Sequence, residues 1–208
     1  ERIMNKRFIW AAGGMVAIVV AVLVALSVSG GEADAEGAAT DGVTGVAAVQ
    51  AQLRGIRQQG NVLGDAGAPV EIVEYGDLAC PACKLASETT VPDLVTAVVR
   101  DGRATLEFRP IAFISPSSER GALAAEAAAE QEAMWSLIEV LYRNQGDERT
   151  DWLSDELLEE TVTALGLDLG KWREDYGSAT IAQRFVGRAR QATDDQVSST
   201  PTFVVRGP

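Results

Sequence analysis

Two cysteines, Cys80 and Cys83, are the residues of this chain best suited to covalent chemistry. They are the first and last residues of the short segment Cys-Pro-Ala-Cys. The β-branched and aromatic run from Val70 to Tyr75 precedes them and is typical of a strand, and Pro81 suits the first turn of a helix. The N-terminus of a helix favours a thiolate, because its free N–H groups stabilise the anion. We therefore expect a reactive thiolate at Cys80. Cys83, on the same helix face, is placed to attack a mixed disulfide on Cys80.

Two other interpretations of this pair stay open. A structural disulfide over so short a loop would stabilise the fold by only about 2 kcal/mol. A Cu(I) ion on two thiolates is chemically sound, but it usually recruits a third ligand such as His or Met. We predict no metal site and no cofactor other than a redox-active disulfide between Cys80 and Cys83.

The composition excludes several other kinds of chemistry. Histidine is absent from the 208 residues, which excludes imidazole-assisted nucleophiles and His-ligated metals. Two cysteines cannot form a four-cysteine zinc site within one chain. Lys and Arg number 18 against 30 Asp and Glu, so the formal net charge is 18 − 30 = −12. A nucleic acid is therefore not an expected partner, because binding phosphates requires a basic surface.

The N-terminal part of the chain predicts a membrane anchor. Residues 8–29 contain no charged residue, and a helix with about 1.5 Å rise per residue would span roughly 30 Å here, the thickness of a bilayer core. Basic residues precede this run and acidic ones follow it, which places residues 1–7 in the cytoplasm and the rest of the chain outside. We expect a single-pass protein of the cell membrane. A cleavable signal peptide and a buried core helix are the alternatives.

The remaining chain divides into a linker and one folded domain. Residues 30–59 are expected to form a flexible linker, because their first part is rich in Gly, Ala and acidic residues. Val46, Val49 and Leu53 recur at helical spacing, so a short lead-in helix is also possible there. The domain is expected over residues 60–208.

Within that domain the pattern predicts a strand–helix–strand unit followed by helices. A helix should run from Pro81 to about Arg100, with Pro92 interrupting it, and a second strand should follow at residues 104–111. An all-helical insertion is expected at about 117–192, beginning with one long helix through Leu123 and Tyr142. Strand-forming residues return after Thr200 and Pro201. The predicted fold class is therefore α/β, with an all-helical insertion and one transmembrane helix before it.

Three features together resemble the DsbA-like thiol-disulfide oxidoreductases, which have a thioredoxin fold with a helical insertion. They are the stretch LGDAGAPVEIVEYGDLACPAC at 63–83, the segment Thr-Pro-Thr-Phe at 200–203, and the helical block between them. The resemblance covers residues 60–208. It implies a thioredoxin-like fold here, and a chain that continues beyond Pro208 with a further strand and helix.

The resemblance also implies roles for individual residues. Cys80 would be the exposed nucleophile and Cys83 the buried resolving cysteine. Thr200 and Pro201 would form a cis-proline loop that faces the cysteines and binds the substrate backbone. Glu74 would be a buried acid that passes protons near Cys83; the alternative is a partly solvated carboxylate at the end of a strand.

Three further residues concern the cysteine segment itself. Ala82 stands where the best-known oxidases have a histidine, so one stabiliser of the Cys80 thiolate is missing. Asp77 is expected to shape the turn before the cysteines. Lys84 either adds a positive charge near Cys80 or lies on the helix surface without a role.

The implied function is a membrane-anchored, extracytoplasmic thiol-disulfide oxidoreductase acting on exported cysteine-containing proteins. The resemblance implies re-oxidation by a quinone-linked membrane partner of the DsbB or vitamin K epoxide reductase type. A reductase or isomerase is one alternative. A non-catalytic accessory subunit of a membrane complex is the other.

Overall fold

The structure is a computed structural model and describes residues 42–208. The predicted cytoplasmic segment 1–7, the anchor 8–29 and the first part of the linker lie outside the described residues. In the part of the chain that the structure describes, no helix has both the length and the apolar character needed to cross a bilayer.

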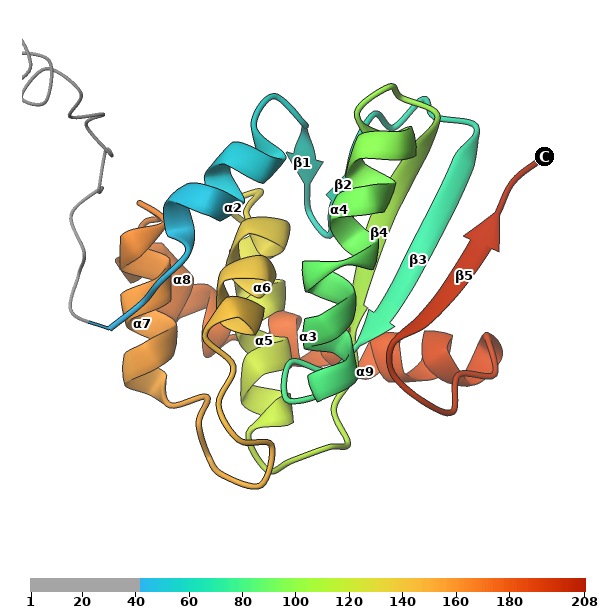
Figure 1. The fold of residues 1–208 in the computed structure, drawn as a ribbon. Coiled ribbons are helices and arrows are strands. Elements are labelled where there is room, and N and C mark those ends of the chain that lie inside the picture. Colours follow the sequence, from blue (N-terminus) through green and yellow to red (C-terminus); the bar gives the residue numbers. More distant parts are fainter. Residues whose placement is uncertain (1–41) are drawn as a thin grey trace, which may run out of the picture. The chain divides into compact units, whose positions relative to one another are not determined.

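A five-stranded sheet with the order β1-β2-β4-β3-β5 lies at the centre of the fold (Figure 1). The strands β3 and β4 run parallel, and every other neighbouring pair runs antiparallel. Their bounds are β1 Gln58–Gln59, β2 Val62–Leu63, β3 Val70–Gly76, β4 Ala104–Pro110 and β5 Thr202–Arg206. The strand–helix–strand unit and the returning strand are confirmed. The two short strands β1 and β2 were not predicted.

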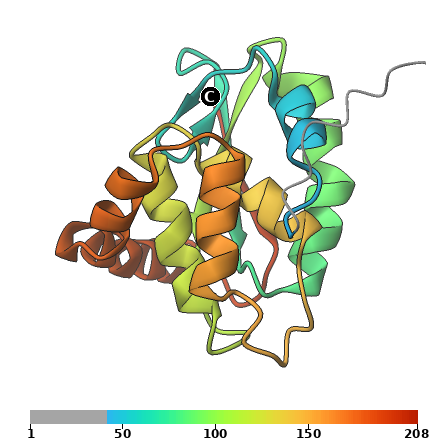
Figure 2. The ribbon, with the colours of Figure 1, turned by 90° about the vertical axis from the view of Figure 1, so that its left-hand side faces the viewer.

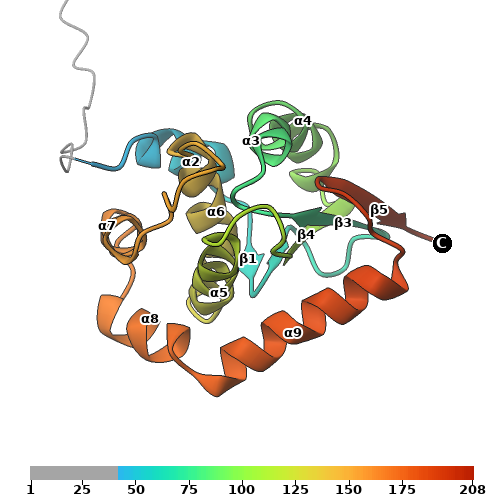
Figure 3. The same cartoon turned by 90° about the horizontal axis from the view of Figure 1, so that it is seen from below.

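Helices cover both faces of this sheet, with α3 and α4 on one side and α9 on the other (Figure 3). Side chains alternate accordingly along the central strands: Ile72 and Leu106 belong to the larger core, and Val73 and Tyr75 pack in the smaller one with Ala192 of α9. The helices are α2 (Val46–Leu53), α3 (Pro81–Glu88), α4 (Thr90–Leu94), the π-helix η1 (Val95–Val99), α5 (Ser118–Ala129), α6 (Met134–Arg143), α7 (Asp155–Ala164), α8 (Leu169–Tyr176) and α9 (Ala179–Asp194).

The helix after the cysteines is interrupted earlier than predicted. The break falls at Thr89, between α3 and α4, and Pro92 lies inside α4. Because proline lacks an N–H and crowds the preceding turn, the disturbance appears before the proline rather than at it.

The insertion consists of α5 to α9 and agrees closely with the predicted bounds (Figure 2). The single long helix expected at its start is wrong, since α5 ends at Ala129 and α6 begins at Met134. Glu132, with a φ of 55°, turns the chain between them. The heptad-like apolar spacing continues across this break, so periodicity alone did not reveal it.

The folded unit begins earlier than the expected boundary at residue 60. Val49 and Leu53 of α2 are buried in the core, and Thr44 exchanges hydrogen bonds with the side chain of Asn144 at the end of α6. Residues 42–59 therefore belong to the fold rather than to a flexible linker, and the lead-in helix is confirmed. The sequence did not indicate this because the preceding residues are mostly small or acidic, and only a few apolar residues, such as Val49 and Leu53, anchor the segment.

Buried ion pairs hold α9 against the sheet and against α5. Arg188 Nε lies 2.7 Å from a carboxylate oxygen of Glu126, which is wholly buried, and Arg188 Nη1 lies 3.4 Å from Glu107 of β4. Glu107 also pairs with Arg109 at 2.8 Å. The insertion is thus fixed to the sheet on the side opposite α3.

Candidate active site

The cysteine segment begins at the carboxyl end of β3, where Asp77 shapes the turn as the sequence predicted. Asp77 Oδ1 accepts a hydrogen bond from the Ala79 N–H at 2.9 Å. Its other oxygen accepts from the N–H groups of Phe113 and Ile114, at 2.9 and 3.0 Å. One buried carboxylate therefore joins the turn before the cysteines to the loop after β4.

Cys80 is the N-cap of α3, and Pro81 is the first residue of that helix. The Cys80 carbonyl accepts hydrogen bonds from the N–H groups of Cys83 and Lys84, both at 3.1 Å. No disulfide joins the two cysteines in this structure. This arrangement puts Cys80 at the positive end of the helix and Cys83 one turn further in, as expected.

The two cysteines differ little in exposure, with Cys80 5% exposed and Cys83 fully buried. The resemblance implied an exposed Cys80, but the loop before β5 covers most of it. Burial raises the pKa of the Cys83 thiol far above its ordinary value. Cys83 therefore keeps its proton and needs a proton acceptor before it attacks.

The covering loop contains Thr200 and Pro201, joined by a cis peptide bond. The Cys80 thiol donates to the Thr200 carbonyl over 3.5 Å, although the two residues lie 120 positions apart in the chain. The hydroxyl of Thr200 is buried without a hydrogen-bond partner in the described part of the chain. The fold thus brings Thr200 and Pro201 to the cysteines, as the resemblance implied.

Glu74 is 1% exposed and lies on β3, on the sheet face that α3 and α6 cover. The alternative of a partly solvated carboxylate is wrong. Burial raises the pKa of Glu74 to about 8, with a further contribution from the nearby carboxyl of Glu139. One of its oxygens has no hydrogen-bond partner among the described residues. Glu74 is thus a buried acid able to hold a proton near neutral pH.

Glu139, on α6, was not identified from the sequence. Its side chain is buried, and the Ser87 hydroxyl of α3 donates to it at 3.0 Å. Burial raises the pKa of Glu139 to about 7. In the sequence it looks like one acidic residue of an amphipathic helix, and nothing there distinguishes it from the exposed ones.

Lys84 does not point freely toward Cys80. Its ammonium pairs with Glu88 one turn further along α3 and donates to the Tyr142 carbonyl at 2.9 Å. Lys84 therefore links α3 to α6. The side chain of Ala82 is exposed and brings no polar group to Cys80.

Residues 77–80, which precede α3, form a turn that we call the cysteine turn. Tyr142, in the last turn of α6, and Gln145, two residues beyond that helix, both contact it, and the sequence analysis missed both. The Tyr142 hydroxyl donates to the Asp77 carbonyl at 3.4 Å. The Gln145 amide donates to the carbonyls of Leu78 and Cys80 at 2.7 and 3.1 Å. These contacts join segments more than 60 positions apart, so local sequence patterns carry no trace of them.

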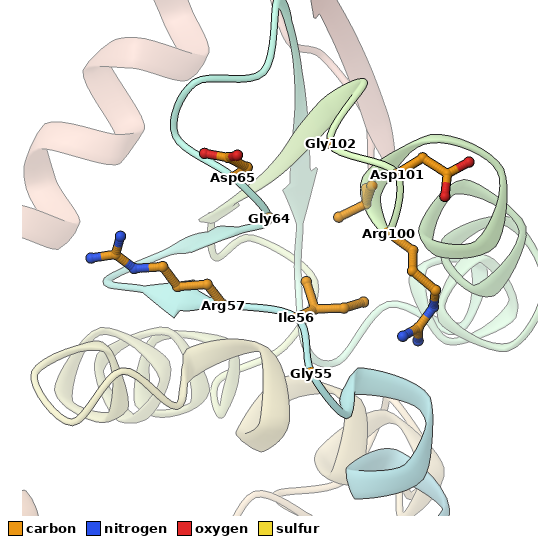
Figure 4. Close-up of a pocket in the computed structure, with 9 residues that line it drawn as sticks. Gly55, Ile56, Arg57, Gly64, Asp65, Arg100, Asp101 and Gly102 are labelled. Atoms are coloured by element: carbon orange, nitrogen blue, oxygen red, sulfur yellow. The ribbon is translucent and has the colours of Figure 1, made fainter.

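A hollow of about 500 Å³ lies where β3 and β4 begin, far along the strands from the cysteines. The side chains of Arg57 and Asp65 lie on one side of it and that of Arg100 on the other (Figure 4). Another hollow, of about 280 Å³, is mostly apolar and is lined by Phe113 and by Ser198 of the cis-proline loop. Among residues 42–208 no three acidic or cysteine residues are grouped as a metal site would require.

Comparisons with known proteins agree with this geometry. Residues 57–208 match the family model described as Thioredoxin. The chain is 30% identical over 149 residues to the probable disulfide bond formation protein D of Bacillus cereus, an alignment covering 70% of this chain and 69% of that protein. It is 36% identical over 148 residues to the Na(+)/H(+) antiporter NhaA 1 of Salinispora arenicola, covering 71% of this chain but only 22% of the antiporter.

The structure also resembles the crystal structure of oxidised BdbD from Bacillus subtilis. The TM-score is 0.65 at 24% sequence identity, and the match covers 73% of this chain and 85% of that one. This likeness supports the thioredoxin-like fold with its helical insertion. Taken with the family model and the relative from Bacillus cereus, it shows that the chain belongs to the DsbA-like thiol-disulfide oxidoreductases.

Proposed function

We propose that this enzyme is anchored to the cell membrane by residues 8–29 and donates its Cys80–Cys83 disulfide to exported cysteine-containing proteins outside the cytoplasm. One observation carries the catalytic part of this proposal. Cys80 lies at the N-terminus of α3 with its sulfur against the Thr200 carbonyl, and the protonated Cys83 lies buried one turn behind it.

The reaction consists of two thiol-disulfide exchanges. The thiolate of a substrate cysteine attacks the Cys80 sulfur, the Cys80–Cys83 bond breaks, and Cys83 departs as a thiolate that takes up a proton. A second substrate thiolate then attacks the substrate sulfur of the mixed disulfide, and Cys80 departs as a thiolate. The substrate dithiol loses two electrons and the enzyme's pair gains them. No other cofactor is required.

Glu74 is proposed as the group that exchanges protons with Cys83. A departing thiolate in a buried position is costly until it is protonated. Glu74 is the buried acid of β3, and its pKa of about 8 keeps its proton available at neutral pH. In the reverse direction its carboxylate takes the proton from the Cys83 thiol.

The substrate is proposed to bind along the cis-proline loop. The main chain at Thr200 and Pro201 would pair with an extended substrate segment, since the sulfur of Cys80 lies against this loop. The apolar hollow lined by Phe113 and Ser198 lies beside it and suits an apolar side chain of an unfolded protein.

The name of the relative from Bacillus cereus, a probable disulfide bond formation protein, supports the donor direction. A donor must be re-oxidised after each turnover. We propose that a quinone-linked membrane enzyme of the DsbB or vitamin K epoxide reductase type accepts the two electrons from Cys80 and Cys83.

The test uses the oxidised full chain and a reduced, unfolded ribonuclease as substrate, with disulfide formation followed by mass. We expect about one substrate disulfide for each enzyme disulfide consumed. The variant Cys80→Ser should form none. Cys83→Ser with its Cys80 activated as a mixed disulfide should accumulate enzyme joined to a substrate that has a single cysteine, because such a substrate has no second thiolate to release Cys80. Disulfide transfer by Cys80→Ser would refute the proposal.

A second candidate is an accessory domain within a membrane complex, favoured by the similar segment inside a protein named as a sodium/proton antiporter. Such a role does not need the cysteines to exchange disulfides. Pull-down of membrane partners by the full chain and by Cys80→Ser separates the two, because an assembly role survives this change and a mixed-disulfide contact does not.

A further inference from the structure

Residues 142–145, the last two of α6 and the two that follow it, contact the cysteine turn at several points. The Gln145 amide donates to the Leu78 carbonyl at 2.7 Å and to the Cys80 carbonyl at 3.1 Å. The Tyr142 hydroxyl donates to the Asp77 carbonyl at 3.4 Å. We name residues 142–145 the α6 brace. Although it belongs to the helical insertion, it holds the backbone of the redox site.

Within this brace Gln145 makes the contact closest to the chemistry. The other donors to the Cys80 carbonyl are the N–H groups of Cys83 and Lys84, which belong to the helix itself. Gln145 is the side-chain donor to that carbonyl, and it binds the Leu78 carbonyl as well. Leu78 and Cys80 are 1% and 5% exposed, so water cannot readily replace the lost donor.

The brace is itself held from outside by the segment that precedes the sheet. Asn144 accepts from the Thr44 N–H at 2.9 Å and donates to the Thr44 carbonyl at 2.9 Å. Arg143 donates to the side chain of Gln52 on α2 at 3.1 Å. Gln145 therefore holds the cysteine turn against a fixed support rather than against a loose chain end.

We propose that Gln145 is a positioning residue that sets the redox equilibrium of the Cys80–Cys83 pair by holding the turn in its dithiol form. The inference rests on the proposed function. In the disulfide form, the S–S bond closes the loop between the two cysteines covalently. In the dithiol form, hydrogen bonds alone keep the Cys80 sulfur at the N-terminus of α3. Loss of Gln145 therefore costs the dithiol more than the disulfide and makes the enzyme a weaker oxidant.

The experiment equilibrates the full chain and its Gln145→Met variant with defined ratios of reduced to oxidised glutathione. Methionine keeps the length of the side chain and removes the donor. At a given glutathione ratio we expect the ratio of dithiol to disulfide to fall about threefold to tenfold. Both forms lose the two hydrogen bonds of Gln145, and the dithiol loses more stability than the disulfide by about the effect of one hydrogen bond. Tenfold corresponds to about 30 mV. Gln145→Glu, which puts a carboxylate against two carbonyl oxygens, should lower it further.

Gln131→Met is the matched control. The Gln131 amide donates to the Asp168 carbonyl at 3.0 Å, within the insertion and away from the cysteines. It removes the same kind of bond and should leave the equilibrium with glutathione unchanged. A folded Gln145→Met with the wild-type equilibrium overturns the inference.

If Gln145→Met fails to fold, Gln145→Asn, whose amide is one methylene shorter, takes its place with the same expected direction. Failure of the proposed function gives a different result, because the wild-type pair itself would then not exchange with glutathione.

Discussion

Burial of Cys83 makes proton transfer part of every disulfide exchange at this site. The thiol is fully buried and its pKa is raised by burial, so the leaving thiolate must be protonated within the protein. The same core holds two buried acids, Glu74 on β3 and Glu139 on α6, and both have raised pKa values. The core therefore holds these carboxyls in their neutral form, and the free energy of unfolding depends on pH for that reason.

Glu74→Gln should change how stability depends on pH. The folded-state pKa of Glu74 is raised from 4.5 to about 8, so its stabilising contribution is complete below pH 4.5. That contribution is lost as pH rises from 4.5 to about 8, because the unfolded state has then released the proton that the folded state still holds, so a rise in pH favours unfolding. For the reduced protein, urea unfolding at pH 5 and pH 8 should show a loss for the wild type that is about 2–4 kcal/mol larger than for Glu74→Gln.

Glu71→Gln is the control on the same strand. Glu71 is partly exposed and pairs with Arg206 at 3.0 Å, so its replacement should leave the loss between pH 5 and pH 8 as in the wild type. Glu139 remains in both variants and maintains part of the slope. Equal slopes for Glu74→Gln and the wild type would show that Glu74 does not hold a proton in the fold.

At the scale of elements, the site depends on two helices of the insertion that meet the sheet from opposite sides. The end of α6 reaches the turn before α3, while α9 leads directly into the loop that covers Cys80. Arg188 fixes α9 through Glu126 of α5 and Glu107 of β4. The position of the cis-proline loop is therefore tied to a buried ion pair.

Arg188→Met should destabilise the protein strongly. Glu126 is wholly buried, and its remaining cation, Arg184, lies 3.9 Å away. Leaving a buried carboxylate with so weak a partner costs about 3–5 kcal/mol. The free energy of unfolding in urea measures this loss. Arg173→Met, which removes the exposed pair with Glu159, should change the free energy of unfolding much less, because water and salt screen an exposed pair. Similar losses in the two variants would contradict the account of how α9 is held.

At the scale of the whole molecule, the sequence predicted the parts whose signal is local. The β-branched run at Val70 predicts β3, and Pro81 predicts the start of α3. Helical periodicity predicts the bounds of the insertion to within a few residues. These signals depend on a few neighbouring residues and not on contacts with distant segments of the chain.

The parts that sequence analysis missed depend on packing between distant segments. In the sequence Glu139 looks like an ordinary polar residue of a surface helix, and Gln145 looks like one of the loop after it. Their contacts form only when α6 packs against α3 and the cysteine turn. The break at Glu132 is hidden because apolar residues continue on both sides of it. The lead-in helix α2 was only one of two possibilities, since few apolar residues mark it.

Equilibration of the full chain with glutathione buffers tests the central claim most directly. Alkylation followed by mass determination counts the thiols of Cys80 and Cys83 at each ratio. We predict that both thiols disappear together, with a midpoint nearer to about −120 mV than to about −270 mV, as for a disulfide donor. A midpoint near −270 mV would contradict the donor direction. A pair that stays oxidised at every ratio would show that the disulfide is structural and that Cys80 is not a catalytic residue.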